Sequence, residues 1–129
     1  IVPTRYAWEG DVKPGARLQF VTILLPHSPT RDASPLASGI TQLLDQPGLA
    51  AVRVVQGNRC ELAVLNPEGT RLELDALAGA RISTDGWAAY VELIDNKLTR
   101  ALVLQGTSLK VGTKDVSSSA DRQDFEIKH

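Results

Sequence analysis

The residue types that perform acid–base, nucleophilic or metal chemistry are few in this chain of 129 residues. It contains two histidines, His27 and His129, and one cysteine, Cys60. A hydrolytic triad needs a nucleophile beside a positioned base, and the sequence has no Gly-x-Ser-x-Gly turn. A zinc site needs three or four ligands, and these three residues are far apart in the sequence. We therefore expect no catalytic residue, no metal site and no cofactor, although His27 and Asp32 can supply two ligands to a site shared with another domain.

Aromatic side chains are the next candidates, because sugar-binding modules stack their ligands on exposed rings. Tyr6 and Trp8 lie together near the first residue and either cap the core or form a small patch. Trp87 is expected in the core, on one face of a strand, and Tyr90 is expected on the opposite face. Tyr6, Trp8, His27 and Tyr90 are the candidate ligand-binding residues, and a structural role is the alternative for each aromatic residue.

Composition excludes several classes of protein. Hydrophobic residues make up 43% of the chain, which argues against disorder. The formal net charge of −1 is a poor match for a nucleic-acid-binding protein, which normally carries a basic patch. The most apolar run, residues 20–26, is far shorter than the roughly 20 residues that cross a bilayer. We expect neither nucleic acid nor a membrane as a partner.

The elements that must position these side chains are predicted to be β-strands. Short runs of alternating or β-branched residues recur between turn signals such as Gly57-Asn58 and Asp95-Asn96. No segment has a convincing helical period over ten residues or more. The sequence therefore predicts an all-β fold, an antiparallel β-sandwich of roughly ten short strands, rich in meanders and with little or no helix. The predicted strands include residues 50–55, 59–65, 71–75, 80–83, 87–94 and 97–104.

The predicted organisation has three parts. Residues 1–16 are a leading segment, residues 17–112 form the sandwich domain, and residues 113–129 are a polar tail. In that tail Phe125 and Ile127 alternate with charged residues, a pattern that permits a final edge strand. The run 17–25 is apolar on both faces, which is typical of a central strand, and one face is expected to meet a partner domain. The polar, proline-rich stretch 26–39 is predicted to be a surface loop, and Cys60 is expected to be buried.

One stretch resembles a known family. Phe20-Val21-Thr22-Ile23-Leu24-Leu25-Pro26-His27, followed by a polar loop, is similar to a segment in the β-sandwich region of heparinase II/III-like polysaccharide lyases. The later pattern Ile82-Ser83-Thr84-Asp85-Gly86, which leads into the strand 87–93, also resembles that region. The similarity extends over about residues 8–112 and rests on strand patterns, with no catalytic signature.

The resemblance implies a larger protein in which a helical toroid precedes the sandwich. Such a protein cleaves an acidic polysaccharide by β-elimination, and the toroid supplies the catalytic tyrosine and most of the polar residues. The chain would then be a non-catalytic scaffold or cleft wall, with His27 and its loop approaching the cleft. Its expected partners are the helical domain and an acidic polysaccharide, and its expected location is periplasmic or extracellular.

Other functions remain open from the sequence. A free-standing sandwich that binds a carbohydrate or a protein is the alternative, and it predicts a row of exposed aromatic rings. A purely structural domain of a bacterial surface or periplasmic protein would bind no glycan. A small standalone enzyme fits least well, because the residue clusters that it requires are missing.

Overall fold

The computed structural model describes residues 11, 13–15, 22, 23, 30, 32, 34–77 and 79–128. Within these residues the chain forms eight strands and one short helix, so the predicted all-β, antiparallel fold is confirmed. The elements are α1 (Ser34–Ser38), β1 (Ile40–Gln46), β2 (Leu49–Gln56), β3 (Arg59–Leu65), β4 (Leu72–Leu77), β5 (Ala80–Thr84), β6 (Ala88–Ile94), β7 (Lys97–Val111) and β8 (Lys114–Lys128).

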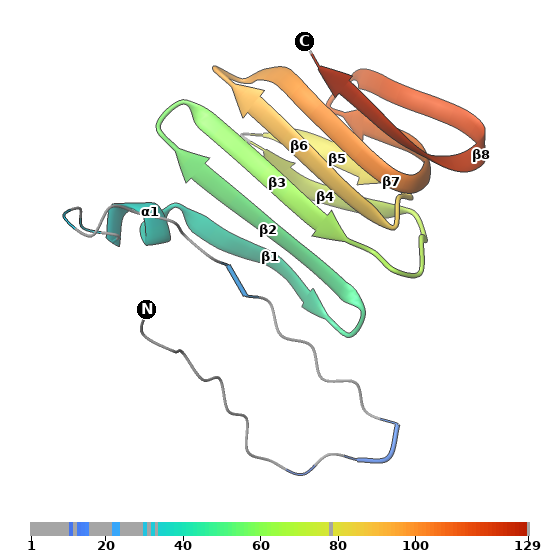
Figure 1. Ribbon diagram of the computed structural model, residues 1–129, viewed down its shortest axis with the longest axis horizontal. Helices are drawn as coiled ribbons and strands as arrows, with labels where there is room; N and C mark the ends of the chain where they lie inside the picture. Colours follow the sequence, from blue (N-terminus) through green and yellow to red (C-terminus); the bar gives the residue numbers. More distant parts are fainter. Residues whose placement is uncertain are drawn as a thin grey trace.

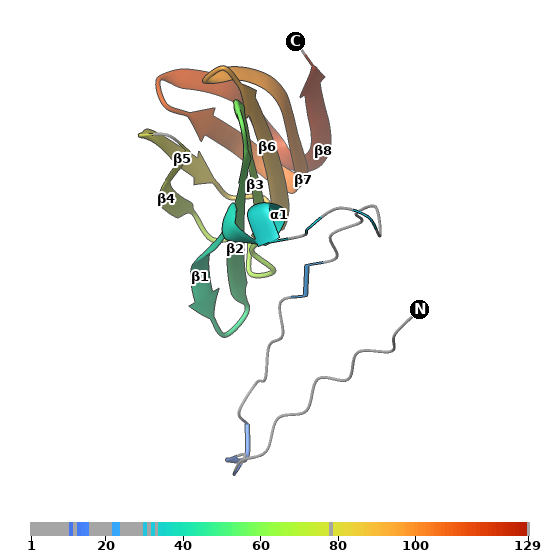
Figure 2. The same ribbon diagram turned by 90° about the vertical axis from the view of Figure 1, so that its left-hand side faces the viewer.

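The strands belong to one continuous antiparallel sheet that curls over itself. Their order is β1-β2-β3-β6-β7-β5-β4, and β8 pairs with β7 outside that path. In Figure 1, β4 and β5 lie behind the layer that β2, β3 and β6 form, and Figure 2 shows them to the left of β3 and β6. The two layers of the predicted sandwich are thus parts of one hydrogen-bonded sheet.

Strand β7 is long enough to join both layers. Its residues 97–104 pair with β6, and its residues 109–111 pair with β5. Between these parts Gln105 has a positive φ of 48°, and the pairing with β8 shifts register around Gly106. A Cβ on Gly106 would lie 2.5 Å from Cγ1 of Val103 and 2.9 Å from Cα of Gly86. Because only a glycine fits this approach, Gly106 lets β7 bend from one layer to the other.

The hydrophobic core lies between the two layers. Alternate residues of β3 and β6 face inward, as the period of two predicts, and Leu62 and Val91 are 1% and 0% exposed. Ile82 on β5 and Leu109 on the second part of β7 close the core from the other layer, at 1% and 0% exposed. Cys60 is also buried, which confirms its predicted environment.

Trp87 contradicts its predicted place in the core, because 41% of it is exposed. It precedes β6 in a bend, so the alternation that buries Ala89 and Val91 does not extend to it. Its N–H donates to the carbonyl oxygen of Leu104 at 2.9 Å, and its own carbonyl oxygen accepts from the N–H of Asn66 at 2.7 Å. These two bonds hold the backbone of Trp87 at the bend.

The run 17–25 is described at Thr22 and Ile23 only, and neither residue belongs to a strand. The prediction of a central strand is therefore wrong at these two residues, and the rest of the run lies outside the described part. Within the polar stretch 26–39 the structure places α1, which has no buried residue. Strand β8 pairs with β7 and includes Phe125, so the final strand that the sequence permitted is present. The predicted domain boundaries stay a prediction. Among the described residues, no helix has the length and apolar character to cross a membrane.

Candidate functional site

Of the four candidate ligand-binding residues, the structure describes Tyr90 alone. Tyr6, Trp8 and His27 lie outside the described residues. Tyr90 lies on β6, opposite Ala63 of β3 and Leu102 of β7, on the sheet face that points away from the core. The prediction that Tyr90 lies opposite the apolar face of its strand is confirmed, and its side chain is half-buried.

The Tyr90 hydroxyl is engaged with a carboxylate. It donates a short hydrogen bond to Oε1 of Glu61, and the Arg100 guanidinium lies 5.9 Å from the ring centroid. Burial raises the pKa of Tyr90, and the hydrogen bond to Glu61 raises the pKa further. A raised pKa keeps the phenol protonated near neutral pH, so Tyr90 is poorly suited to remove a proton from a substrate.

Charged side chains around Tyr90 neutralise one another across the strands. Nη2 of Arg59 on β3 lies 3.0 Å from Oε1 of Glu61 on the same strand and 2.7 Å from Oε1 of Glu92 on β6. Arg100 on β7 donates to Glu126 of β8 at 2.7 Å. Such cross-strand pairs each add a few tenths of a kcal/mol to about 1 kcal/mol to the stability of a sheet. The ion pairs around Tyr90 therefore stabilise the sheet and leave little unpaired charge that could bind a ligand.

A small hollow lies beside Tyr90 on the same outer face. It measures about 290 Å³, and Ile23, Val52, Val54 and Ala63 give it a mainly apolar lining. A hollow of this size and composition accommodates an apolar side chain or one face of a sugar ring. It offers few polar groups that would orient a ligand.

A larger opening lies at the end of the sheet where the hairpins β2–β3, β6–β7 and β7–β8 turn. Two adjoining cavities of about 400 and 490 Å³ share Asn96 as a lining residue. We call this opening the hairpin-end groove. Its polar lining includes Arg53, Asn58, Arg59, Asp95, Asn96, Lys97, Thr113 and Lys114, and its apolar lining includes Val55, Cys60, Leu93, Leu98 and Val111.

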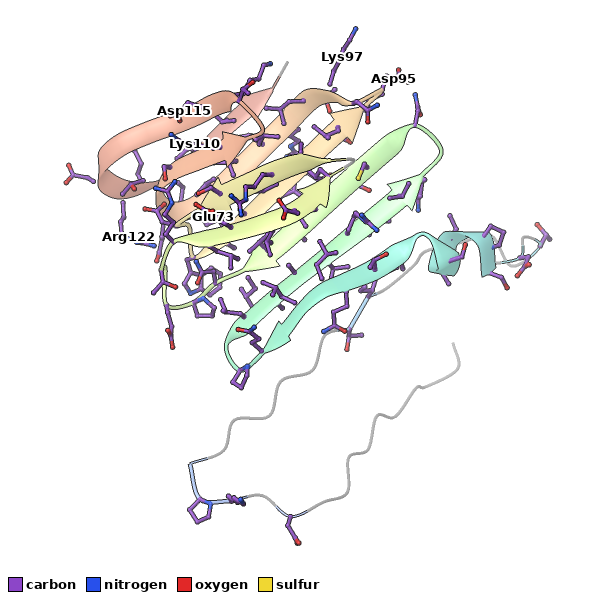
Figure 3. The ribbon with its side chains drawn as sticks, turned by 180° about the vertical axis from the view of Figure 1, so that it is seen from behind. Glu73, Asp95, Lys97, Lys110, Asp115 and Arg122 are labelled. Carbon is purple, nitrogen blue, oxygen red and sulfur yellow. The ribbon has the colours of Figure 1, made fainter. Side chains whose placement is uncertain are left out.

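Three of the four cations that line the hairpin-end groove have no ion-pair partner among the described residues, and the fourth, Arg59, pairs with Glu61 and Glu92. In the described part of the chain Arg53, Lys97 and Lys114 form no ion pair, whereas Arg59, Arg71, Arg81, Arg100 and Lys110 each do. Asp95 is the acidic residue of the groove, and its carboxylate accepts from Nδ2 of Asn58 at 2.9 Å. In Figure 3 Asp95 and Lys97 lie together beyond the end of the sheet. The groove is therefore locally positive in a chain whose formal net charge is −1.

Arg53 has an unusual position for a charged residue. It faces the core side of β2, in register with Leu62 of β3 and Thr41 of β1. Its Nη1 donates to the carbonyl oxygen of Ala76 on β4 and its Nη2 donates to Oγ1 of Thr41, both at 3.4 Å. Because β1 and β4 are the two ends of the sheet path, Arg53 bridges the seam where the curled sheet nearly closes.

The Arg53 guanidinium is incompletely satisfied within the described residues. Its Nε is buried and has no hydrogen-bond partner, and its two hydrogen bonds lie at the long end of the accepted range. A buried donor without a partner costs about 1–3 kcal/mol, and more when the group is charged. Because Nε is shielded from solvent, an anion in the groove would bind the guanidinium through Nη1 or Nη2.

The thiol of Cys60 lines the same groove but is not activated. Burial raises the pKa of Cys60, and this effect outweighs the opposing influence of the Arg53 charge. The thiol therefore stays protonated near neutral pH. Among the residues that the structure describes, no three His, Cys, Asp or Glu side chains gather in a group that could hold a metal ion.

The sequence prediction missed the hairpin-end groove. The one local signal was Arg53 itself, which occupies an inward position of an otherwise apolar strand, between Ala51 and Val55. Lys97 and Lys114 follow turns, where a lysine is unremarkable in a sequence. Only the fold brings the three cations to one end of the sheet.

No protein-family model matches this chain, and a search of curated proteins finds no match.

Proposed function

We propose that this chain is the non-catalytic β-sandwich portion of a heparinase II/III-like lyase that cleaves an acidic polysaccharide by β-elimination. Its role would be that of a scaffold or cleft wall beside a preceding helical domain. The proposal rests on the sequence resemblance and on one structural observation that supports it. Three cations that have no ion-pair partner within the described part of the chain line a single groove, as a wall that faces a polyanion requires.

A non-catalytic role is supported by the groups available for β-elimination. The reaction needs a base that removes the proton next to the uronate carboxylate, and it needs charge stabilisation for the developing enolate. Tyr90 has a raised pKa, and its hydroxyl already donates to Glu61. It also lies on the outer face of the sheet, whereas Arg53 lies on the inner face. We therefore assign the catalytic base to the helical domain.

A free-standing binding module is the second candidate. It is favoured by the lining of the hairpin-end groove, which places polar and apolar groups side by side. Such a module would bind a carbohydrate or a protein without any enzymatic activity. Periplasmic or extracellular location belongs to both candidates as a proposal.

The size of the native gene product separates the two candidates. An antibody raised against this chain would be used to immunoblot the source cells. A band several times larger than 13.9 kDa would support the lyase proposal, and the purified protein would then be tested for unsaturated uronate products on acidic polysaccharides. A band near 13.9 kDa would overturn it, because no helical domain would be present.

A deletion gives a second test on the larger protein. Removal of this domain should reduce the turnover of long polymers, while the isolated chain should form no unsaturated product. Elimination activity of the isolated chain would contradict the non-catalytic assignment.

A further inference from the structure

We propose that the hairpin-end groove is a binding subsite for a hexuronate unit, in which Arg53 receives the sugar carboxylate. The acidic nature of the ligand rests on the proposed function. The position of the subsite rests on the geometry of the groove alone.

Arg53 presents the donors that a carboxylate needs. A guanidinium binds a carboxylate through two parallel N–H groups, and its planar fork fixes the orientation of both partners. Nε of Arg53 is buried, and Nη1 and Nη2 are held only by the 3.4 Å bonds to Ala76 and Thr41. A carboxylate in the groove would therefore bind the Nη groups in exchange for these long bonds.

The apolar lining of the groove suits the sugar ring. Val55 and Cys60 lie beside Arg53 in one cavity, and Leu93 and Leu98 lie in the adjoining cavity. These four residues pair across β2, β3, β6 and β7 on the inward face of the sheet. Val55 is 39% exposed and provides the accessible apolar surface, whereas the other three are buried. Sugar rings expose C–H groups on their faces, and burial of that surface is favourable. Cavities of about 400 and 490 Å³ fall within the range of about 300–1,000 Å³ that is typical of small-molecule sites.

The remaining polar groups of the groove fit a chain longer than one sugar. Lys97 and Lys114 add two positive charges in the second cavity, and Asn96 lies where the two cavities meet. Amide and hydroxyl groups such as those of Asn96 and Thr113 can bond sugar hydroxyls. A uronate in the first cavity would thus place a neighbouring sugar, with its own anionic group, near the two lysines.

A structural role for Arg53 as a seam bridge makes a different prediction. In that case its replacement would lower stability but leave ligand binding unchanged. Arg53→Lys and Arg53→Gln separate the two roles, because lysine retains the charge and lacks the fork, whereas glutamine lacks the charge.

Binding is measured by NMR on the ¹⁵N-labelled chain of 129 residues. The probes are a glucuronate-containing tetrasaccharide and the same tetrasaccharide with its carboxylates reduced to alcohols. We expect amide shifts at Gly57, Asn58, Asn96, Gly112 and Thr113 with the acidic probe and much weaker shifts with the neutral probe. Loss of the Arg53 interaction should weaken binding by about tenfold to a hundredfold in Arg53→Gln. Arg53→Lys should retain part of the affinity.

Two further variants keep the test decisive if Arg53→Gln does not fold. Lys97→Gln and Lys114→Gln change exposed residues, and each should weaken binding severalfold and reduce its dependence on salt. Arg81→Gln is the matched control, because it removes an exposed arginine that pairs with Glu73 and Asp75 outside the groove. It should bind like the unaltered chain.

The outcomes also separate this subsite from the proposed function. Absence of shifts, equal shifts with both probes, or shifts confined to the outer face around Tyr90 would each overturn the subsite. If the groove binds the acidic probe but the native protein has no helical domain, the subsite stands and the lyase proposal fails. If the native protein is a lyase and the groove binds neither probe, the reverse holds.

Discussion

Replacement of Asp85 is expected to loosen the connection between the two layers of the sheet. Asp85 lies between β5 and β6, and its Oδ1 accepts from the backbone N–H groups of Thr107 at 2.9 Å and Ser108 at 3.0 Å. Its Oδ2 accepts a short hydrogen bond from the Thr107 hydroxyl. Arg122 donates to the Asp85 carbonyl oxygen at 2.6 Å. Asp85 thus fixes the loop to the part of β7 that passes between the layers.

The magnitude follows from the three bonds to the carboxylate. A hydrogen bond to a charged group contributes about 1.5–3 kcal/mol to stability. Asp85 is only partly buried, so water can reach the N–H groups that its removal would free. We therefore expect Asp85→Ala to lower the free energy of unfolding by about 2–4 kcal/mol. Asp85→Asn retains an acceptor oxygen and should cost about 1–2 kcal/mol.

The pH dependence has a definite sign. Burial alone would raise the pKa of Asp85, but the bonds from Thr107 and Ser108, together with the charge of Arg122, lower the pKa below its ordinary value of 3.8. The stabilisation is therefore fully present above pH 3.8 and is lost as the pH falls through the lowered pKa of the folded state. The gap in stability between the unaltered chain and Asp85→Asn should be constant above about pH 5 and should narrow only in stronger acid.

Urea unfolding followed by circular dichroism measures this gap across pH. Asp75→Asn is the control, because the Asp75 side chain is 83% exposed and lies 3.4 Å from Arg81. It should change stability by less than about 0.5 kcal/mol. A cost below 1 kcal/mol for Asp85→Ala, or a gap that stays constant down to pH 2, would refute the reasoning.

Three further predictions concern the core, the bend in β7 and the outer face. Leu62→Ala should cost about 2–5 kcal/mol in urea unfolding, whereas Leu65→Ala, on the same strand but 37% exposed, should cost less than about 1 kcal/mol; similar costs would contradict the inward face assigned to β3. Gly106→Ala should cost about 1–3 kcal/mol, because the new methyl group would lie 2.5 Å from Cγ1 of Val103, and a Val103→Ala background should reduce that cost. The phenolate absorbance that disappears in Tyr90→Phe should have its midpoint above the ordinary pKa of 10.0, since burial and a neighbouring carboxylate favour the neutral phenol. The related stability is present below pH 10.0 and is lost as the pH rises through the folded pKa, and a midpoint at or below 10.0 would contradict the environment assigned to Tyr90.

The hairpin-end groove and the outer face differ in how their charges are used. On the outer face Arg59, Glu61 and Glu92 satisfy one another, and a ligand would have to displace existing ion pairs. In the groove Arg53 and Lys114 have no ion pair to break within the described residues. An anionic ligand therefore gains more binding free energy in the groove than at the ion pairs around Tyr90. Tyr90 was nevertheless the residue that the sequence suggested.

The sequence by itself determined the local structure of the strands β2 to β6. The Gly57-Asn58 hairpin signal predicted the strand 59–65, which is β3, and Cys60 was expected to be buried, as it is. The Asp95-Asn96 turn was recognisable because Asp and Asn tolerate the positive φ values of 51° and 60° that the hairpin requires. Alternation and turn chemistry depend on neighbours along the chain, so they can be recognised without the fold.

Only the tertiary structure decided how the strands share their edges and faces. It made β7 a single strand of 15 residues that serves both layers, and it left Trp87 exposed at a bend where the alternation stops. It also carried Arg53 to Ala76, 23 residues away in the sequence, and brought Lys97 and Lys114 to the same end of the sheet. These outcomes depend on the curl of the whole sheet, which arises from long-range packing that no local pattern encodes.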